Sequence, residues 1–165
     1  MIVVGAEQIK RRHADPCNRR TLPIKEGMRV LALDIGDATI GLAVCDELGI
    51  SAHGLPTIRR RRDARDLEEL GRVVRETAAT VLVVGIPFNM DGTESEQTRK
   101  TRAFAGELAA FGLPIEEVDE RWTTVAAERA LREGAVSRRK RKRLVDQVAA
   151  VLILQTYLAL RGKAR

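Results

Sequence analysis

The order of strand-like and helix-like segments constrains the fold of this chain more than any other feature of the sequence. Three short segments rich in β-branched and apolar residues come first, separated by turn residues, at 29–36, 39–49 and 54–60. Apolar residues at helical spacing over 63–79 then precede the buried-strand pattern of 80–87. An antiparallel meander, extended by parallel strands through helical crossovers, satisfies this order.

The second half of the chain continues the alternation. Thr93, followed three residues later by Glu96, forms a capping-box pattern that predicts the start of a helix. Residues 114–120 have the pattern of a last strand, and helices are expected from 123 or 124 to about 132 and from about 141 to 160. The predicted fold class is α/β: a mixed five-stranded sheet, with three antiparallel strands and two parallel strands, flanked by helices.

A polar segment precedes this pattern. Residues 1–27 carry six basic and three acidic residues without a sustained period, which predicts a disordered basic N-terminal extension. Residues 28–165 have a length that suits a single domain. Because Met28 stands directly before the first strand, we expect the functional protein to begin there.

Charge and cysteine content narrow the classes of partner. The chain carries 29 Lys and Arg against 23 Asp and Glu, a net charge of +6, which favours a polyanion such as a nucleic acid. Cys17 and Cys45 lack metal-ligand spacing and are typical of free thiols in a reducing compartment. Apolar runs are shorter than the roughly 20 residues of a membrane span. We therefore expect a cytoplasmic protein without a membrane partner.

Three carboxylates occupy positions where the pattern predicts a core. Asp34 ends the first strand, Glu120 follows the last strand, and Asp146 heads an apolar helical face that includes Ala149, Ala150, Ile153 and Tyr157. Acids in such places usually have a cation, a proton or a dense hydrogen-bond network as partner. Three converging acids indicate a divalent-metal site, although each also fits an ordinary structural role in a turn, on the surface or at a helix N-terminus.

Asp119 and Glu120 are neighbours, and strand alternation points them to opposite faces. Glu120 is the favoured metal ligand, and Asp119 is expected to face solvent or to pair with Arg121. Trp122 next to these acids is more consistent with a core position than with a base-stacking platform.

Several further residues are candidates for binding a phosphate-containing substrate. Residues 85–93 join a buried strand to a helix N-terminus, where N–H groups and side-chain oxygens can accept a phosphate, although turn chemistry explains the same residues. The basic run 138–143 directly precedes Asp146, so it can hold nucleic-acid phosphates or be a solvated loop. The candidate substrate-binding residues are Asn89, Asp91, Thr93, Arg121, Arg138, Arg139, Lys140 and Arg141.

Four ordered stretches resemble the YqgF/RuvX family, nucleases of pre-16S ribosomal RNA that are related to Holliday-junction resolvases: LALDIGDATIGLAVCD, VVGIPFNMDGTES, VDERWTT and VDQVAAVLILQTYL. The resemblance spans about residues 29–160. It implies a ribonuclease H-like nuclease domain in residues 28–165, acting in 5′-end maturation of the small-subunit RNA. It also implies that Asp34, Glu120 and Asp146 are the catalytic residues and the ligands of Mg²⁺ or Mn²⁺.

The expected reaction is hydrolysis of a phosphodiester by one or two metal ions, paired ions lying roughly 3.5–4 Å apart. The partner is expected to be a ribosomal RNA precursor, or branched DNA if the protein is a junction resolvase, and the protein to be a monomer or homodimer. One departure from the family is Asp37-Ala38-Thr39, where a Lys-Arg pair is usual. It favours, as the main alternative, a catalytically inactive nucleic-acid-binding module. An actin-like ATPase would need a duplicated fold, for which the chain is too short.

Overall fold

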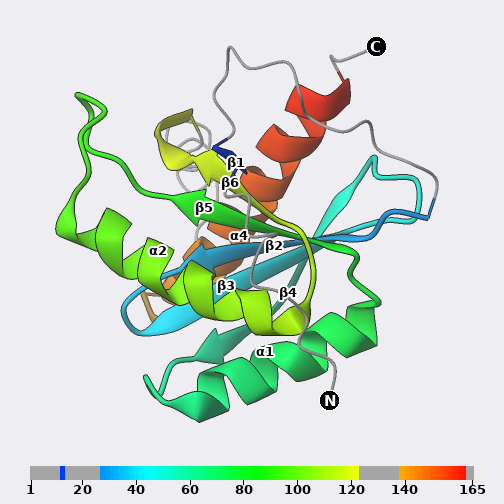
Figure 1. The fold of residues 1–165 in the computed structure, drawn as a ribbon, viewed down its shortest axis with the longest axis horizontal. Helices are drawn as coiled ribbons and strands as arrows, with labels where there is room; N and C mark the ends of the chain where they lie inside the picture. The colour runs from blue at the N-terminus through cyan, green and yellow to red at the C-terminus, as the bar shows by residue number, and fades with distance from the viewer. Residues whose placement is uncertain (1–11, 14–26, 123–137, 163–165) are drawn as a thin grey trace, which may run out of the picture.

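The computed structural model describes residues 12–13, 27–122 and 138–162, and of residues 12, 13, 122, 138–146 and 162 it describes the backbone alone. The six strands of its single sheet lie in the order β1-β6-β5-β2-β3-β4 (Figure 1). Their bounds are β1 (Arg12–His13), β2 (Val30–Ile35), β3 (Thr39–Cys45), β4 (Ala52–Arg59), β5 (Val81–Ile86) and β6 (Ile115–Asp119).

Strand directions confirm the predicted mixed sheet. β2, β3 and β4 pair in antiparallel fashion, and β5 and β6 continue the sheet from β2 in parallel. The two-residue β1 adds a sixth strand, parallel to β6. β1 belongs to the segment expected to be disordered, whose other residues up to 26 lie outside the described part of the chain. The domain boundary at residue 28 stays a prediction.

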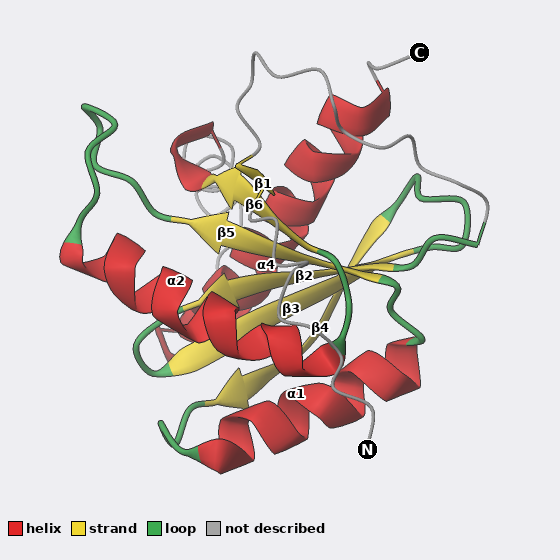
Figure 2. Ribbon diagram, in the orientation of Figure 1, coloured by secondary structure: helices red, strands yellow, loops and turns green. Residues whose placement is uncertain are grey.

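Helices cover both faces of the sheet. α1 (Ala64–Thr77) and α2 (Glu96–Glu107), with the short 3₁₀ helix η1 (Leu108–Phe111), pack on one face, and α4 (Arg138–Gly162) packs on the other (Figure 2). A second 3₁₀ helix, η2 (Glu120–Trp122), follows β6 directly. The helix expected between 123 and about 132 lies outside the described residues. None of the described helices is long and apolar enough to span a membrane.

Alternation along the strands divides the apolar residues into two cores. Leu31, Leu33 and Ile35 of β2 face α1 and α2, whereas Val30 and Ala32 face α4. Position 34 therefore lies on the α4 face. In β6, Val118 belongs to the α4 core, and Glu116 forms an ion pair with the buried Arg161 of α4. Side chains at even positions of β2 and β6 thus meet the same helix.

The start of α2 differs from the sequence prediction. Ser95 is the N-cap, and it forms a capping box with Thr98 instead of the predicted pair Thr93 and Glu96. The hydroxyl of Thr93 donates to the carboxylate of Asp91 at 2.7 Å, and the backbone N–H of Thr93 donates to the same oxygen at 2.9 Å. Because Asp91 engages Thr93 inside the loop, the cap moves two residues along the chain.

Candidate active site

Asp34 lies near the end of β2, and Glu120 directly follows the end of β6; these are the two parallel strands that flank β5. Leu33 of β2 pairs with Val84 of β5, and Gly85 of β5 pairs with Val118 of β6. The acids therefore reach the α4 face of the sheet on either side of Gly85. This arrangement places two carboxylates at one edge of the sheet, as the strand-end positions predict.

Gly85 makes room for the Glu120 carboxylate. A Cβ atom at position 85 would overlap an oxygen of Glu120 and the Cδ1 methyl of Ile153 in α4. Gly85 is not among the site residues predicted from the sequence. A single glycine inside the predicted buried strand 80–87 is the sequence signal that could have identified it, because such a glycine often marks a close approach by another group.

Burial and neighbouring charge make Glu120 hard to ionise. Burial is the largest cause, followed by the negative charges of Asp34 and Asp119, and together they raise the pKa of Glu120 from 4.5 to about 8. A proton or a cation can balance this concentration of negative charge. Carboxylate oxygens are the ligands preferred by Mg²⁺ and Mn²⁺, so the pair fits a divalent ion.

Asp119 pairs with Arg121, one of the two outcomes expected for it from the sequence. The Asp119 carboxylate accepts hydrogen bonds from the backbone N–H of Arg121 at 3.0 Å and from its guanidinium at 2.6 Å. Hydrogen bonding to Asp119 raises the pKa of Arg121, and the charge of Asp91 adds to this rise. The Arg121 guanidinium also lies 5.8 Å from the ring centre of Phe88. Arg121 therefore connects the end of β6 to the loop after β5.

That loop brings together three of the predicted substrate-binding residues. Asn89 donates from its amide to the Thr93 hydroxyl at 2.9 Å, and Thr93 donates to Asp91. Hydrogen bonds from Thr93 lower the pKa of Asp91. All three side chains are exposed. The loop has a defined shape at the same edge of the sheet as Asp34, with polar groups directed to solvent.

Asp146 lies near the beginning of α4, and its side chain is outside the described part of the chain. The next positions on its helical face, Ala150, Ile153 and Tyr157, are buried against the sheet. Gln147, one residue further on, donates to the carbonyl of Leu55 in β4 at 2.8 Å. The helix thus lies over β4 at Gln147 and passes Gly85 at Ile153.

The structure brings together two of the three predicted metal ligands. Among the side chains that it describes, no group of three His, Cys, Asp or Glu is close enough to hold a metal ion. Asp146 as the third ligand stays a prediction. So does a role for residues 138–141, whose side chains are likewise not described.

Known proteins are similar to this chain along most of its length. The family model of RuvX, described as Holliday junction resolvase, matches residues 28–160. A protein of Moorella thermoacetica named "Putative pre-16S rRNA nuclease" is 52% identical over 132 residues, which are 79% of this chain and 94% of that protein. A protein of the same name from Clostridium novyi is 48% identical over 132 residues, 79% of this chain and 98% of that protein.

A solved structure shares the fold. T. thermophilus RuvC in complex with Holliday junction substrate has a TM-score of 0.50 and 18% sequence identity, covering 80% of this chain and 96% of that chain. The mixed sheet with helices on both faces is accordingly ribonuclease H-like. Because the family model covers most of the chain and relatives about half identical match along it, this protein belongs to the RuvX family of nucleases.

Proposed function

We propose that this protein hydrolyses phosphodiester bonds of nucleic acid with a divalent ion, Mg²⁺ or Mn²⁺, held by Asp34, Glu120 and Asp146. The observation that carries the proposal is the pair formed by Asp34 and Glu120, in which burial and mutual repulsion raise the pKa of Glu120 to about 8. A bound divalent ion would relieve that repulsion. When bound, it would supply Lewis acidity for activating water and for stabilising the leaving oxygen.

The protein's own residues would position the substrate around these acids. The recess at Gly85 holds the Glu120 carboxylate in place. Arg121 and the loop with Asn89, Asp91 and Thr93 lie at the same edge and would contact the nucleic-acid backbone on one side. Four basic residues precede Asp146 in α4: Arg138, Arg139, Lys140 and Arg141. They would contact the nucleic-acid backbone on another side.

The preferred substrate is the 5′ end of pre-16S ribosomal RNA, because close relatives that align over nearly their whole length carry the name of that activity. Such a role places the protein in the cytoplasm. A four-way DNA junction is the second candidate, favoured by the family description and by the shared fold with RuvC. A resolvase would act as a homodimer, whereas an RNA-processing enzyme can act as a monomer.

The test is cleavage by the purified full chain. Precursor RNA spanning the mature 5′ end and a four-way DNA junction are each incubated with Mg²⁺, Mn²⁺ or EDTA, beside Asp34→Asn. Asp46→Asn is the matched control, because Asp46 is a partly exposed acid in the β3–β4 turn, hydrogen-bonded to Ser51. We expect metal-dependent cleavage by the wild type and the control, with retained binding but no cleavage by Asp34→Asn.

The substrate that is cut distinguishes RNA processing from junction resolution. Full activity of Asp34→Asn would remove Asp34 from the mechanism. Absence of cleavage by folded protein that still binds RNA would support the inactive binding module instead.

A further inference from the structure

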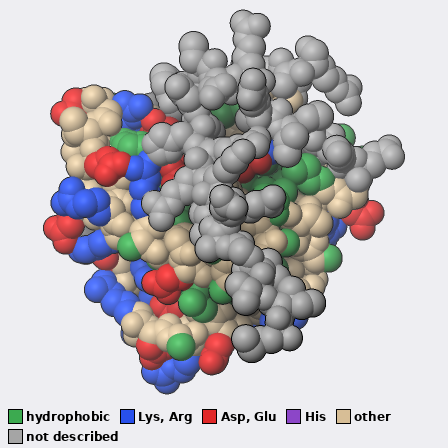
Figure 3. All heavy atoms as spheres, in the orientation of Figure 1, with side chains coloured by type: hydrophobic (Ala, Val, Ile, Leu, Met, Phe, Trp, Pro, Cys, Tyr) green, Lys and Arg blue, Asp and Glu red, His purple; other side chains and the backbone are tan. Residues whose placement is uncertain are grey.

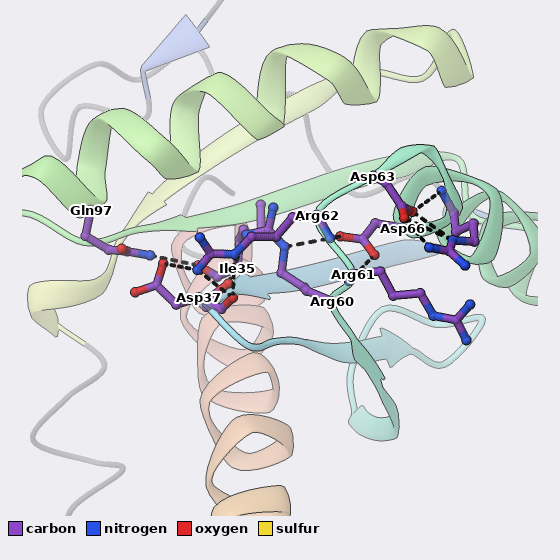
Figure 4. Close-up of polar contacts among 10 residues, drawn as sticks. Ile35, Asp37, Arg60, Arg61, Arg62, Asp63, Asp66 and Gln97 are labelled. Carbon is purple, nitrogen blue, oxygen red and sulfur yellow. Dashed lines mark hydrogen bonds and ion pairs between the residues drawn. The ribbon is translucent and has the colours of Figure 1, made fainter.

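The turn between β2 and β3 is held by residues from two other parts of the chain. Arg60, which follows β4, donates from Nη1 to the carbonyl of Gly36 at 2.9 Å, and Gln97 of α2 donates to the carbonyl of Ile35 at 3.3 Å (Figure 4). The Arg60 guanidinium also lies 4.6 Å from the ring centre of Phe104. Because the turn directly follows Asp34, these contacts fix the backbone beside the candidate metal ligand.

Asp66 gives the arginine run 59–62 a defined shape. Its carboxylate is buried and accepts hydrogen bonds from the backbone N–H groups of Arg61 at 2.7 Å and Arg62 at 3.0 Å. Arg62 has a φ of 59°, in the left-handed region that favours glycine. The loop thus keeps a long cationic side chain at a position where glycine would be less strained.

The side chain of Arg62 lies across the β2–β3 turn and pairs with Asp37. Its Nη2 atom is 3.2 Å from Oδ1 of Asp37 and 3.1 Å from the carbonyl oxygen of the same residue (Figure 4). Both side chains remain largely exposed, at 62% and 61%. The pair therefore lies in solvent, three residues beyond Asp34.

Other basic groups surround this pair. Lys100 of α2 pairs with Glu96, which is the main cause of its raised pKa, and it is also close enough to be influenced by the charges of Asp37 and Arg62. Lys and Arg side chains gather along the side of the molecule where α1 and α2 begin (Figure 3). Asp37 is thus an acid among basic side chains beside the candidate active site.

We propose that Arg62 binds a backbone phosphate of the nucleic-acid substrate, and that Asp37 occupies its guanidinium until the phosphate displaces the carboxylate. The inference rests on the proposed function, because it takes the substrate of the site to be nucleic acid. An exposed Arg–Asp pair contributes little in water. A phosphate in a polyanion binds the same guanidinium in bidentate fashion and releases condensed counterions, so the exchange is favourable.

The test compares two substitutions that are expected to change the affinity for RNA in opposite directions. Affinity of the full chain for a short fluorescein-labelled single-stranded RNA is measured by fluorescence anisotropy in EDTA, where cleavage is blocked, over a series of salt concentrations. Arg62→Gln is expected to weaken binding about three- to tenfold and to lower the slope of log K against log salt by about 1. Asp37→Asn is expected to tighten binding about two- to fivefold.

The double variant identifies the cause of the tightening. If Asp37 acts by occupying Arg62, most of the gain from Asp37→Asn is lost in the Arg62→Gln background. The matched control is the pair Arg72–Glu76 on α1, with an N–O distance of 2.7 Å and side-chain exposures of 56% and 58%. Arg72→Gln and Glu76→Gln are expected to keep the affinity for RNA within about twofold of the wild type, because this pair lies further along α1 from the Arg62–Asp37 pair.

Two results would overturn the inference: unchanged affinity of Asp37→Asn, or a gain that persists in full without Arg62. Either result, together with metal-dependent cleavage by the wild type, would leave the proposed function intact. The expected binding shifts in a protein that cuts neither substrate would support the phosphate contact and contradict the nuclease mechanism.

Discussion

Replacing Glu120 with glutamine is expected to stabilise the metal-free protein, by an amount that increases with pH. The pKa of Glu120 is about 8 in the folded protein, against an ordinary value of 4.5, because of burial and of the charges of Asp34 and Asp119. Below about pH 4.5 the folded and unfolded states both hold the proton, so the carboxyl adds no pH dependence. Between these two values the unfolded state loses its proton while the folded state keeps it. Stability therefore falls as pH rises.

The size of the effect follows from the two pKa values. Each pH unit between them costs about 1.4 kcal/mol, so the penalty is about 3 kcal/mol at pH 7 and reaches about 5 kcal/mol above pH 8. Glutamine has nearly the same shape and no charge, so it removes this penalty. The wild type and Glu120→Gln are expected to have similar stability near pH 4.5 and to differ most near pH 8.

The measurement is urea unfolding in EDTA at a series of pH values. Glu107→Gln serves as the control, because Glu107 is exposed at the end of α2. Added Mg²⁺ is expected to stabilise the wild type and to leave Glu120→Gln unchanged. The reasoning would be refuted if wild type and Glu120→Gln lost stability in parallel as pH rises, or if the variant were the less stable protein near pH 8.

Three further substitutions test the packing around the site and the helix ends, each by urea unfolding. Gly85→Ala is expected to cost about 1–3 kcal/mol and to weaken Mn²⁺ binding, because the added Cβ displaces the carboxylate of Glu120. Glu116→Gln is expected to cost about 3–5 kcal/mol, because it leaves the buried guanidinium of Arg161 without its carboxylate. Ser95→Ala is expected to cost about 1 kcal/mol through loss of the N-cap of α2.

Each of these substitutions has a control of the same kind. Gly106→Ala is expected to stabilise α2 by about 0.5–1 kcal/mol, because a Cβ there meets open space. Glu76→Gln breaks an exposed ion pair and is expected to cost less than about 1 kcal/mol. Thr93→Ala is expected to affect α2 less than Ser95→Ala. The packing account would be contradicted if either buried substitution were as harmless as its control.

The sheet and its helices could be predicted because the information is local. Apolar runs such as 80–87 and the turn residues between the first three strands encode each element within a few residues. The approach of Asp34 to Glu120 followed from one topological rule, since parallel strands end at the same edge of a sheet. These features require no knowledge of which side chains touch.

Features that depend on packing between distant segments were not predictable. The role of Gly85 requires the register of β5 with β6 and the position of Ile153. The contact between Arg62 and Asp37 joins residues 25 apart, through a loop shape that Asp66 imposes. The cap of α2 was wrongly predicted because the Thr93 hydroxyl is engaged inside the loop, where it accepts from the Asn89 amide and donates to Asp91, and Ser95 caps the helix.

That Asp34 and Glu120 together hold the ion needed for cleavage is tested most directly by measuring Mn²⁺ binding and RNA cleavage on the same protein samples. Electron paramagnetic resonance reports the bound fraction of Mn²⁺ for the wild type, Asp34→Asn, Glu120→Gln and the control Asp46→Asn. We predict that the wild type and the control bind Mn²⁺ and cut, and that both active-site variants lose ion binding and cleavage together. Cleavage at the wild-type rate by a variant that no longer binds Mn²⁺ would contradict the metal-dependent mechanism.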